Sequence, residues 1–223
     1  MIILSQKHDI IYYHPTLDVN RIYRAFTICY ASTKNLSFDE QCDFIARHFN
    51  PNGVRPHTSP IEHSSLSVEF TTNRGIATEL LRHRLVSANQ ESTRYCNYSR
   101  DRFAEDSDAV LVEEHPFDFK GGVKFIMDPR FNADYDNFLL DCKACEEAYM
   151  RRIKNGHVAE EARGVLNNDV ATRVMITTNF VEWRHILNLR TAPEAHYQIR
   201  SLLRPLKNYL AKDLPCVFGD LAD

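Results

Sequence analysis

The sequence predicts an α+β fold, with a central mostly antiparallel sheet flanked by helices and a long helix in the second half. Several segments repeat apolar residues at helical spacing, whereas only a few separated segments have the pattern of strands. Helices mixed with a few non-consecutive strands are typical of α+β domains. Because no internal repeat, low-complexity tract or flexible linker is visible, we expect a single domain over residues 1–223.

Two helices are predicted near the N-terminus. The apolar residues that recur at helical spacing in residues 16–29 are Ile22, Ala25, Phe26 and Cys29. A second helix begins at Ser37, which forms with Glu40 a capping box that satisfies free backbone donors at the helix start. The Asn-Pro-Asn-Gly run at 50–53 ends it, since a helix is disfavoured before proline and glycine permits the turn.

Residues 64–72 are predicted to form a half-buried strand, because apolar and polar residues alternate along it. Its apolar face consists of Leu66, Val68 and Phe70. A helix follows from Asn73, and its buried stripe is Ile76, Ala77, Leu80 and Leu81. Residues 82–84 fall at the C-terminal end of this helix, and a polar loop continues through Ser92 and Tyr95.

The second half adds one long helix and several shorter elements. In chain order we expect a short strand at 109–113, a turn at 121–122, a long helix at 133–154, a short helix at 159–166, a strand at 170–178 and helices at 180–189 and 194–211. Asn155 and Gly156 are predicted to cap the C-terminal end of the long helix.

The composition is that of an ordinary globular protein. Of the 223 residues, 43% are hydrophobic and 26% charged, and the net charge is -3. That balance argues against a general nucleic-acid binder, which is usually basic. The N-terminus lacks a secretory signal, and no stretch approaches the roughly 20 apolar residues of a membrane span. The six cysteines are irregularly spaced, so we expect a reduced, cytoplasmic protein without disulfides.

Three adjacent cation-capable residues, Arg82, His83 and Arg84, predict an anion-binding site. Like charges in a row need anions to stabilise them, and arginine suits planar groups such as phosphate, carboxylate or imide. On a helix, Arg82 and Arg84 would point about 200° apart, which favours two ligands, or one ligand and a neighbouring subunit. The alternative is a basic helix end that complements the helix dipole, or simply a solvated face.

The residues that follow favour the functional interpretation. The polar residues of the loop are Ser87, Asn89, Gln90, Ser92, Arg94 and Tyr95. A loop so rich in donors without glycine or proline is unusual for a simple turn.

Four segments together resemble the flavin-dependent thymidylate synthase family. Residues 82–95, RHRLVSANQESTRY, resemble its Arg-His-Arg motif with a serine after seven residues. Residues 57–63, HTSPIEH, and 162–166, ARGVL, resemble two further family segments. Residues 179–190, NFVEWRHILNLR, resemble its helix that ends in Leu-x-Leu-Arg. The resemblance spans roughly residues 20–200.

The resemblance implies an enzyme that methylates deoxyuridine monophosphate (dUMP) at C5 to thymidylate (dTMP). It implies FAD as the cofactor whose reduced form supplies hydride, NADPH to recharge the flavin, and 5,10-methylenetetrahydrofolate as one-carbon donor. It also implies a homotetramer with shared active sites. Neither nucleic acid nor membrane is an expected partner.

The resemblance also assigns residues. Those that match flavin contacts are Ser59, Arg82, His83, Arg84, Gln90, Asn179, Val181 and His185. Those that match the nucleotide-binding surface are Glu79, Arg82, Gln90, Glu91, Ser92, Thr93, Arg94, Arg163 and Arg190. Arg190 matches the catalytic arginine thought to favour ionisation of uracil N3, because a fixed guanidinium stabilises that anion. His57 matches a histidine linked to methyl transfer.

Some residues depart from the family pattern or are interpreted conservatively. Glu79 stands where glutamine is common, Gln90 where glutamate is common, and Val181 where arginine is common, so Val181 contacts flavin through its backbone at most. Ser92 is interpreted as a substrate ligand rather than a nucleophile, because activation would need a paired general base.

No metal site is predicted. Cys142 and Cys145 form a Cys-x-x-Cys pair, but they recur with apolar neighbours at helical spacing, and no second ligand pair is evident. We therefore expect both to pack in the core.

Two other hypotheses remain open. A nucleotide- or nucleic-acid-binding regulatory protein could use the Arg-His-Arg loop on phosphates, although the acidic balance disfavours it. The other hypothesis is a flavin-binding relative that has lost catalysis. Because Arg190 and Ser92 are both present, loss of the site is not indicated.

Overall fold

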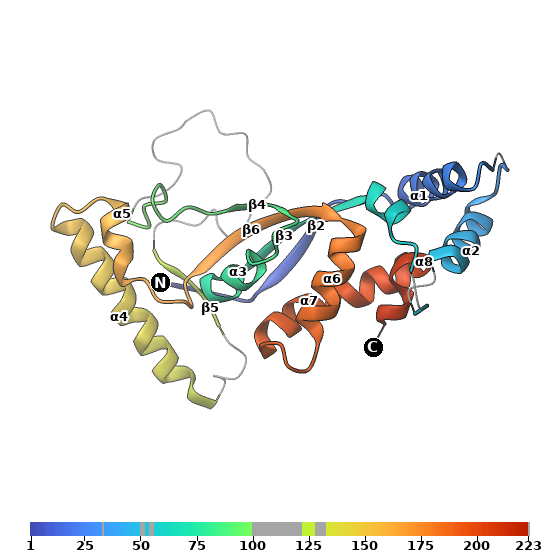
Figure 1. Ribbon diagram of the computed structural model, residues 1–223. Helices are drawn as coiled ribbons and strands as arrows, with labels where there is room; N and C mark the ends of the chain where they lie inside the picture. Colours follow the sequence, from blue (N-terminus) through green and yellow to red (C-terminus); the bar gives the residue numbers. More distant parts are fainter. Residues whose placement is uncertain (33, 50–51, 54–55, 100–121, 128–132, 223) are drawn as a thin grey trace. The chain divides into compact units, whose positions relative to one another are not determined.

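The computed structural model describes residues 1–32, 34–49, 52–53, 56–99, 122–127 and 133–222 (Figure 1). The chain divides into two compact units, each built from separate segments. The first unit comprises Met1–Lys7, Phe70–Leu80 and Gln90–Val174, and the second comprises His8–Glu69, Leu81–Asn89 and Met175–Asp223. The expectation of one domain over 1–223 stays a prediction. The strand predicted at 109–113, Gly121 and residues 50–51 lie outside the described residues.

A four-stranded sheet has the order β2-β3-β6-β4, with bounds Lys7–Tyr12, Ser65–Asn73, Ala171–Asn179 and Ser87–Gln90. Backbone bonds at both ends of β3 and β6 fix their direction. The Phe180 N–H donates to the Ser64 carbonyl at 3.0 Å, and the Arg74 N–H donates to the Val170 carbonyl at 3.0 Å. Residue numbers increase along β3 in the direction in which they decrease along β6, so the pair is antiparallel. The predicted α+β class is confirmed.

Strand β3 is more buried than its sequence pattern predicts. Leu66, Val68 and Phe70 are fully buried as expected, but Ser67 and Thr71 on the other face are buried too. The prediction of a half-buried strand was therefore wrong. The buried Ser67 hydroxyl is satisfied, because Ser67 and Thr177 share a hydrogen bond of 2.8 Å.

The two N-terminal helices are confirmed as α1, Pro15–Cys29, and α2, Phe38–Phe49. The predicted capping box of α2 forms. Ser37 donates from both its N–H and its Oγ to Glu40 Oε2 at 2.8 Å, and the Glu40 N–H returns to Ser37 Oγ at 3.4 Å. These bonds lower the pKa of the Glu40 carboxyl.

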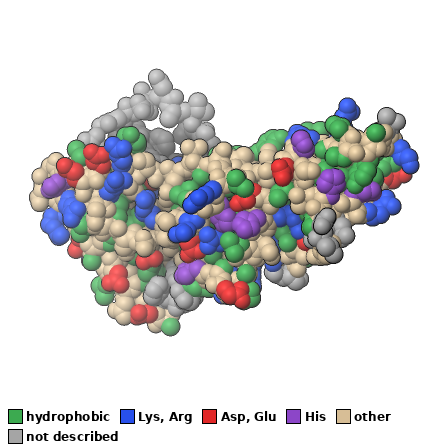
Figure 2. All heavy atoms as spheres, viewed as in Figure 1, with side chains coloured by type: hydrophobic (Ala, Val, Ile, Leu, Met, Phe, Trp, Pro, Cys, Tyr) green, Lys and Arg blue, Asp and Glu red, His purple; other side chains and the backbone are tan. Residues whose placement is uncertain are grey.

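Aromatic and histidine rings fill the contact between α1 and α2. His48 stacks on Phe44 with ring centroids 3.8 Å apart, and His57 meets Phe26 edge-on at 5.2 Å. Figure 2 shows histidine side chains among hydrophobic ones over these two helices. His57, which the resemblance links to methyl transfer, thus has a packing role in the second unit.

Helix α3, Arg74–Leu80, is shorter than predicted. Asn73 caps it, since its Oδ1 accepts the Ile76 N–H at 2.8 Å. Leu81 is 38% exposed rather than part of the buried stripe. Arg82, His83 and Arg84 lie in the turn beyond the helix, so the helical geometry that set Arg82 and Arg84 about 200° apart does not apply to them.

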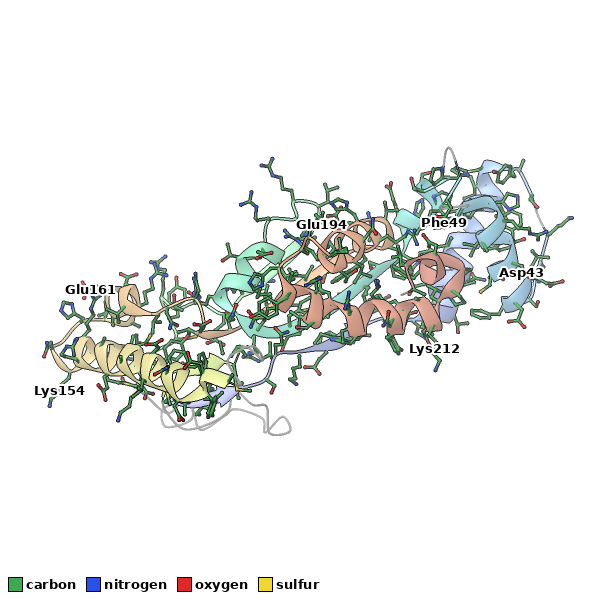
Figure 3. The ribbon with its side chains drawn as sticks, turned by 90° about the horizontal axis from the view of Figure 1, so that it is seen from below. Asp43, Phe49, Lys154, Glu161, Glu194 and Lys212 are labelled. Atoms are coloured by element: carbon green, nitrogen blue, oxygen red, sulfur yellow. The ribbon has the colours of Figure 1, made fainter. Side chains whose placement is uncertain are left out.

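The long helix is confirmed as α4, Tyr135–Lys154, in the first unit. The C-cap is Asn155, and Gly156 follows with a φ of +91°, which glycine adopts at no steric cost. The predicted short helix is α5, Ala159–Ala162, continued by the 3-10 turn η3, Arg163–Val165. Figure 3 labels Lys154 at the end of α4 and Glu161 on α5 beside it.

Cys142 and Cys145 lie on the buried face of α4 and pack in the core of the first unit, as predicted. Their neighbours there include Phe138, Tyr149 and Val170. Burial raises the pKa of the Cys142 thiol to about 12, which keeps it protonated and unreactive.

The second unit is completed by helices α6, Phe180–Thr191, α7, Tyr197–Asp213, and α8, Pro215–Phe218, with the 3-10 turns η1, Ser59–His63, and η4, Gly219–Leu221. The buried Trp183 of α6 donates from Nε1 to the Leu66 carbonyl at 2.8 Å. Arg184, one residue on, is bidentate to Asp220 at 2.6 Å and lies 4.8 Å over the Phe49 ring. Helix α6 is therefore anchored to both the sheet and the C-terminal turn.

Several short elements were missed. Strands β1, Ile2–Leu4, and β5, Lys124–Ile126, pair in parallel in the first unit. Strands β2 and β4, together with α8, were also not predicted. Segments of this length carry too few residues for a period to appear, and β4 is an edge strand with no apolar face. All six cysteines are free thiols, and no described helix is long and apolar enough to cross a bilayer.

Candidate active site

Four side chains of the second unit form a histidine cluster: His83, Glu182, His185 and Arg190. Arg190 donates from Nε to His83 Nε2 at 3.1 Å, although the two residues are 107 positions apart in sequence. On the other side of the ring, His83 Nδ1 lies 3.4 Å from Glu182 Oε1. The His185 ring meets that of His83 at 5.7 Å with an interplanar angle of 74°.

Helix α6 positions three of these residues. Its N-cap is Asn179, whose Oδ1 accepts the Glu182 N–H at 2.9 Å. Glu182 and His185 follow one turn apart, and Arg190 lies in the last turn. Figure 2 shows histidine and Lys/Arg side chains grouped close to this helix. A capped and anchored helix thus presents a carboxylate, an imidazole and a guanidinium to the buried His83.

The His83 ring is neutral at physiological pH. Burial, then the charges of Arg190 and His185, lower its pKa to about 4. A neutral imidazole has one donor and one acceptor nitrogen. Because Arg190 is always a donor, Nε2 is the acceptor and the proton is on Nδ1, which faces Glu182.

Metal-ligand geometry also occurs in this cluster. His83, Glu182 and His185 each place a ligand atom within 4.8 Å of the others. The guanidinium of Arg190 is bonded to the same imidazole, however, and its positive charge opposes a cation there.

Exposed donors flank the cluster. Arg82 and Arg84 are exposed in the turn, and Ser59 is exposed at the start of η1. Among the described residues, neither guanidinium has a recorded ion pair or hydrogen bond. Two exposed arginines separated by one residue are a suitable donor set for a phosphate-bearing ligand.

In the first unit, residues 90–94 form a loop cluster with Arg163. Gln90 Nε2 donates to Thr172 Oγ1 at 3.3 Å, and the Glu91 N–H donates to the Arg173 carbonyl at 2.9 Å. These contacts hold the start of the loop on the edge of β6.

The rest of the loop cluster is held by side chains. The Glu91 carboxylate lies 3.8 Å from Arg173 Nε and accepts from the Tyr98 hydroxyl at 3.4 Å. Arg163 Nη1 donates to the buried Thr93 Oγ1 at 3.2 Å.

Two further residues complete the loop cluster. Arg94 Nε donates to Glu160 Oε2 at 3.0 Å, and Ser92 Oγ accepts the Arg94 N–H at 3.3 Å. The described contacts of Ser92 include no histidine or carboxylate, and its interpretation as a substrate ligand stays a prediction.

The predicted residues therefore separate into two groups. The second unit holds Ser59, Arg82, His83, Arg84, Asn179, Val181, His185 and Arg190. The first unit holds Glu79, Gln90, Glu91, Ser92, Thr93, Arg94 and Arg163. The structure brings His83, His185 and Arg190 together, and Thr93 with Arg163, whereas Glu79 lies half-buried on α3 and Val181 half-buried on α6.

Sequence reasoning missed Glu182. Its spacing of three residues before His185, directly after a strand, is a signal that was available.

Comparisons with known proteins agree on one family. The family model described as thymidylate synthase complementing protein matches residues 11–216. The flavin-dependent thymidylate synthase of Geobacter sulfurreducens is 28% identical over 203 residues, which cover 88% of this chain and 78% of that protein. The enzyme of Mycobacterium tuberculosis is 30% identical over 172 residues, 74% of this chain and 64% of its own length.

Two solved structures share the fold. The UMP/dUMP methylase PolB from Streptomyces cacaoi, bound with 5-Br dUMP, has a TM-score of 0.72 at 18% identity and covers 98% of this chain and 96% of its own. The flavin-dependent thymidylate synthase from Helicobacter pylori, complexed with FAD and dUMP, has a TM-score of 0.72 at 20% identity, covering 97% and 100%. At these identities the likeness extends to the fold alone.

Proposed function

This chain belongs to the family of flavin-dependent thymidylate synthases, and we propose on that basis that it methylates dUMP reductively to dTMP. The proposed one-carbon donor is 5,10-methylenetetrahydrofolate, and the proposed hydride source is FADH2 recharged by NADPH. The observation that carries the proposal is the contact of Arg190 with His83, which joins the family's arginine helix to its Arg-His-Arg motif.

Arg190 is the proposed catalytic residue. A guanidinium held in place by a hydrogen bond is pre-organised, so it stabilises charge without reorganising when that charge develops. Beside a uracil ring it would favour loss of the N3 proton and so make the ring more nucleophilic at C5. Its bond to a neutral His83 is made through Nε.

The donor set of the second unit fits FAD. Arg82 and Arg84 flank His83 and are both exposed, and among the described residues neither has an ion pair, which suits the two phosphates of a dinucleotide. Ser59, Asn179 and His185 add uncharged hydrogen-bonding groups in the same unit, and Val181 offers its backbone. When bound, reduced FAD supplies the hydride.

The loop cluster of the first unit supports binding of an anionic nucleotide. Arg94 and Arg163 are exposed arginines that are held in place by Glu160 and Thr93 respectively. Ser92 adds a hydroxyl, and Gln90 an amide already anchored to β6. We propose that Arg163 and Arg94 bind the phosphate of dUMP, with Glu79 and Gln90–Thr93 as the remaining nucleotide contacts.

The test begins with the purified protein. It should be yellow or bind added FAD, and it should release tritium from C5-labelled dUMP when methylenetetrahydrofolate and NADPH are present. Running UMP in parallel distinguishes a deoxyribonucleotide enzyme from one that also accepts ribonucleotides, as the Streptomyces cacaoi methylase does by its description. A colourless protein that does not bind FAD and releases no tritium would favour a regulatory nucleotide- or nucleic-acid-binding protein instead.

We further propose a cytoplasmic homotetramer. The free thiols of all six cysteines support a reducing setting, and the exposed Leu85 and Tyr95 in the motif segment support coverage by another subunit. Light scattering of the FAD-bound protein should give the mass of four chains. A monomer with full activity would rule out active sites shared between subunits.

A further inference from the structure

Glu182 is a buried carboxylate for which the proposed function has no role. Its exposed fraction is 9%. Burying a charge is costly unless a partner compensates for it. Among the described residues, the recorded polar contact of its side chain is His83 Nδ1 at 3.4 Å, a distance from which a small ring rotation forms a hydrogen bond.

His83 connects this carboxylate to Arg190. Its Nε2 accepts from Arg190 Nε, so the ring can serve Arg190 only while its proton is on Nδ1. The opposite tautomer would place an Nε2–H against the Arg190 N–H, donor against donor. Glu182 faces Nδ1 and therefore stabilises the tautomer that accepts from Arg190.

We propose that Glu182 is a positioning residue that acts through His83 to hold the Arg190 guanidinium in its working orientation. The role of Arg190 in catalysis rests on the proposed function, whereas the tautomer of His83 does not. A carboxylate that orients an imidazole is effective because it fixes both the ring plane and the position of the proton.

Two variants of similar size separate positioning from packing. Glu182→Gln keeps an acceptor oxygen for Nδ1–H, whereas Glu182→Leu fills the same space without one. Glu194→Gln is the matched control, because Glu194 is an exposed acid of the same unit, labelled in Figure 3, outside the histidine cluster.

The first measurement is the tautomer of His83, by NMR of the FAD-bound protein labelled with 15N-histidine, the resonance being assigned through its loss in His83→Gln. We expect Nδ1–H in the wild type, in Glu182→Gln and in the control, and a mixture or Nε2–H in Glu182→Leu. A wild-type ring protonated on Nε2, or an unchanged tautomer in Glu182→Leu, overturns the proposal. If the leucine variant does not fold, Glu182→Ala replaces it, and the wild-type tautomer decides regardless.

The second measurement is the kinetics with dUMP. We expect kcat of Glu182→Leu to fall on the order of 10- to 100-fold, as when an orienting partner of a histidine is lost, with a much smaller change in KM. Glu182→Gln should recover most of that loss. Equal kcat in the leucine and glutamine variants would overturn the proposal. A wild type that forms no dTMP but keeps the Nδ1–H tautomer would instead refute the proposed function.

Discussion

The histidine cluster and the loop cluster each contain part of the 82–95 segment, yet they are built differently. His83 and Glu182 are buried, and α6 holds their neighbours on a capped helix. In the loop cluster, Arg94 and Glu160 pair with side chains 54% and 48% exposed. Buried contacts are rigid and costly to break, whereas exposed ion pairs contribute little and exchange readily with solvent or an anion. The buried pair of His83 and Glu182 is therefore expected to be rigid, whereas the exposed pair of Arg94 and Glu160 can exchange for an anion.

The largest effect should follow from removing the side chain of Arg190 from the histidine cluster. Arg190→Ala should reduce dTMP formation on the order of 10³-fold, because a pre-organised donor to developing charge is lost. FAD should remain bound, as measured by its absorbance after gel filtration. Arg204→Ala, an exposed arginine on α7 in the same unit, should leave the rate unchanged. If Arg190→Ala kept its activity, the proposed catalytic role of Arg190 would be wrong.

The second effect concerns stability and pH. The pKa of His83 is lowered to about 4, whereas an unfolded histidine titrates near 6.5. The unfolded chain therefore binds the proton first, so this contribution to the free energy of unfolding is complete above about pH 6.5 and is lost as the pH falls toward 4. Urea unfolding should show a loss of about 2 kcal/mol between about pH 7.5 and about pH 5 that is absent in His83→Gln. The same loss in His83→Gln would assign the effect to another group.

A smaller effect should follow in the loop cluster, on binding rather than rate. Thr93→Val removes the hydroxyl that accepts from Arg163. We expect KM for dUMP to rise about 5- to 10-fold, equivalent to about 1 kcal/mol, with kcat nearly unchanged. Thr93→Ser keeps the hydroxyl and should retain the wild-type KM. A fall in kcat without a change in KM would mean that the loop cluster, like the histidine cluster, affects the rate rather than substrate binding.

The smallest effect should come from the most exposed pair. Glu160→Gln breaks the contact with Arg94 and should change the free energy of unfolding by less than about 1 kcal/mol. Chemical denaturation of both proteins at the same salt concentration measures it, with Glu161→Gln on the same helix for comparison. A loss above about 2 kcal/mol would mean that this pair is structural rather than exchangeable.

Local patterns predicted local structure well. The capping box of Ser37 and Glu40 predicted the start of α2, and Asn155 with Gly156 predicted the end of α4. Each of these features depends on residues a few positions apart. Strand β4 was missed for the opposite reason, since only its pairing with the distant β6 makes it a strand.

The site shows the same limit. No spacing rule joins His83 to Arg190 across 107 positions; the resemblance named both, and the structure supplied the bond. Glu182 was missed because an acidic residue in the first turn of a helix is ordinarily explained by the helix dipole. The opposed directions predicted for Arg82 and Arg84 were wrong because they required a helix through residue 84, whereas α3 ends at Leu80.

The cap of α6 determines which atoms Asn179 can offer to a ligand. Its amide oxygen accepts the Glu182 N–H, which fixes the side chain, and the Nδ2 amino group supplies the donors of the amide. The part of a ligand that contacts Nδ2 must be an acceptor, such as a carbonyl or phosphate oxygen. An aspartate in its place would keep the oxygen that caps the helix but would have no N–H to donate to the ligand. The exchange of Asn179 for aspartate would therefore test ligand recognition without removing the helix cap.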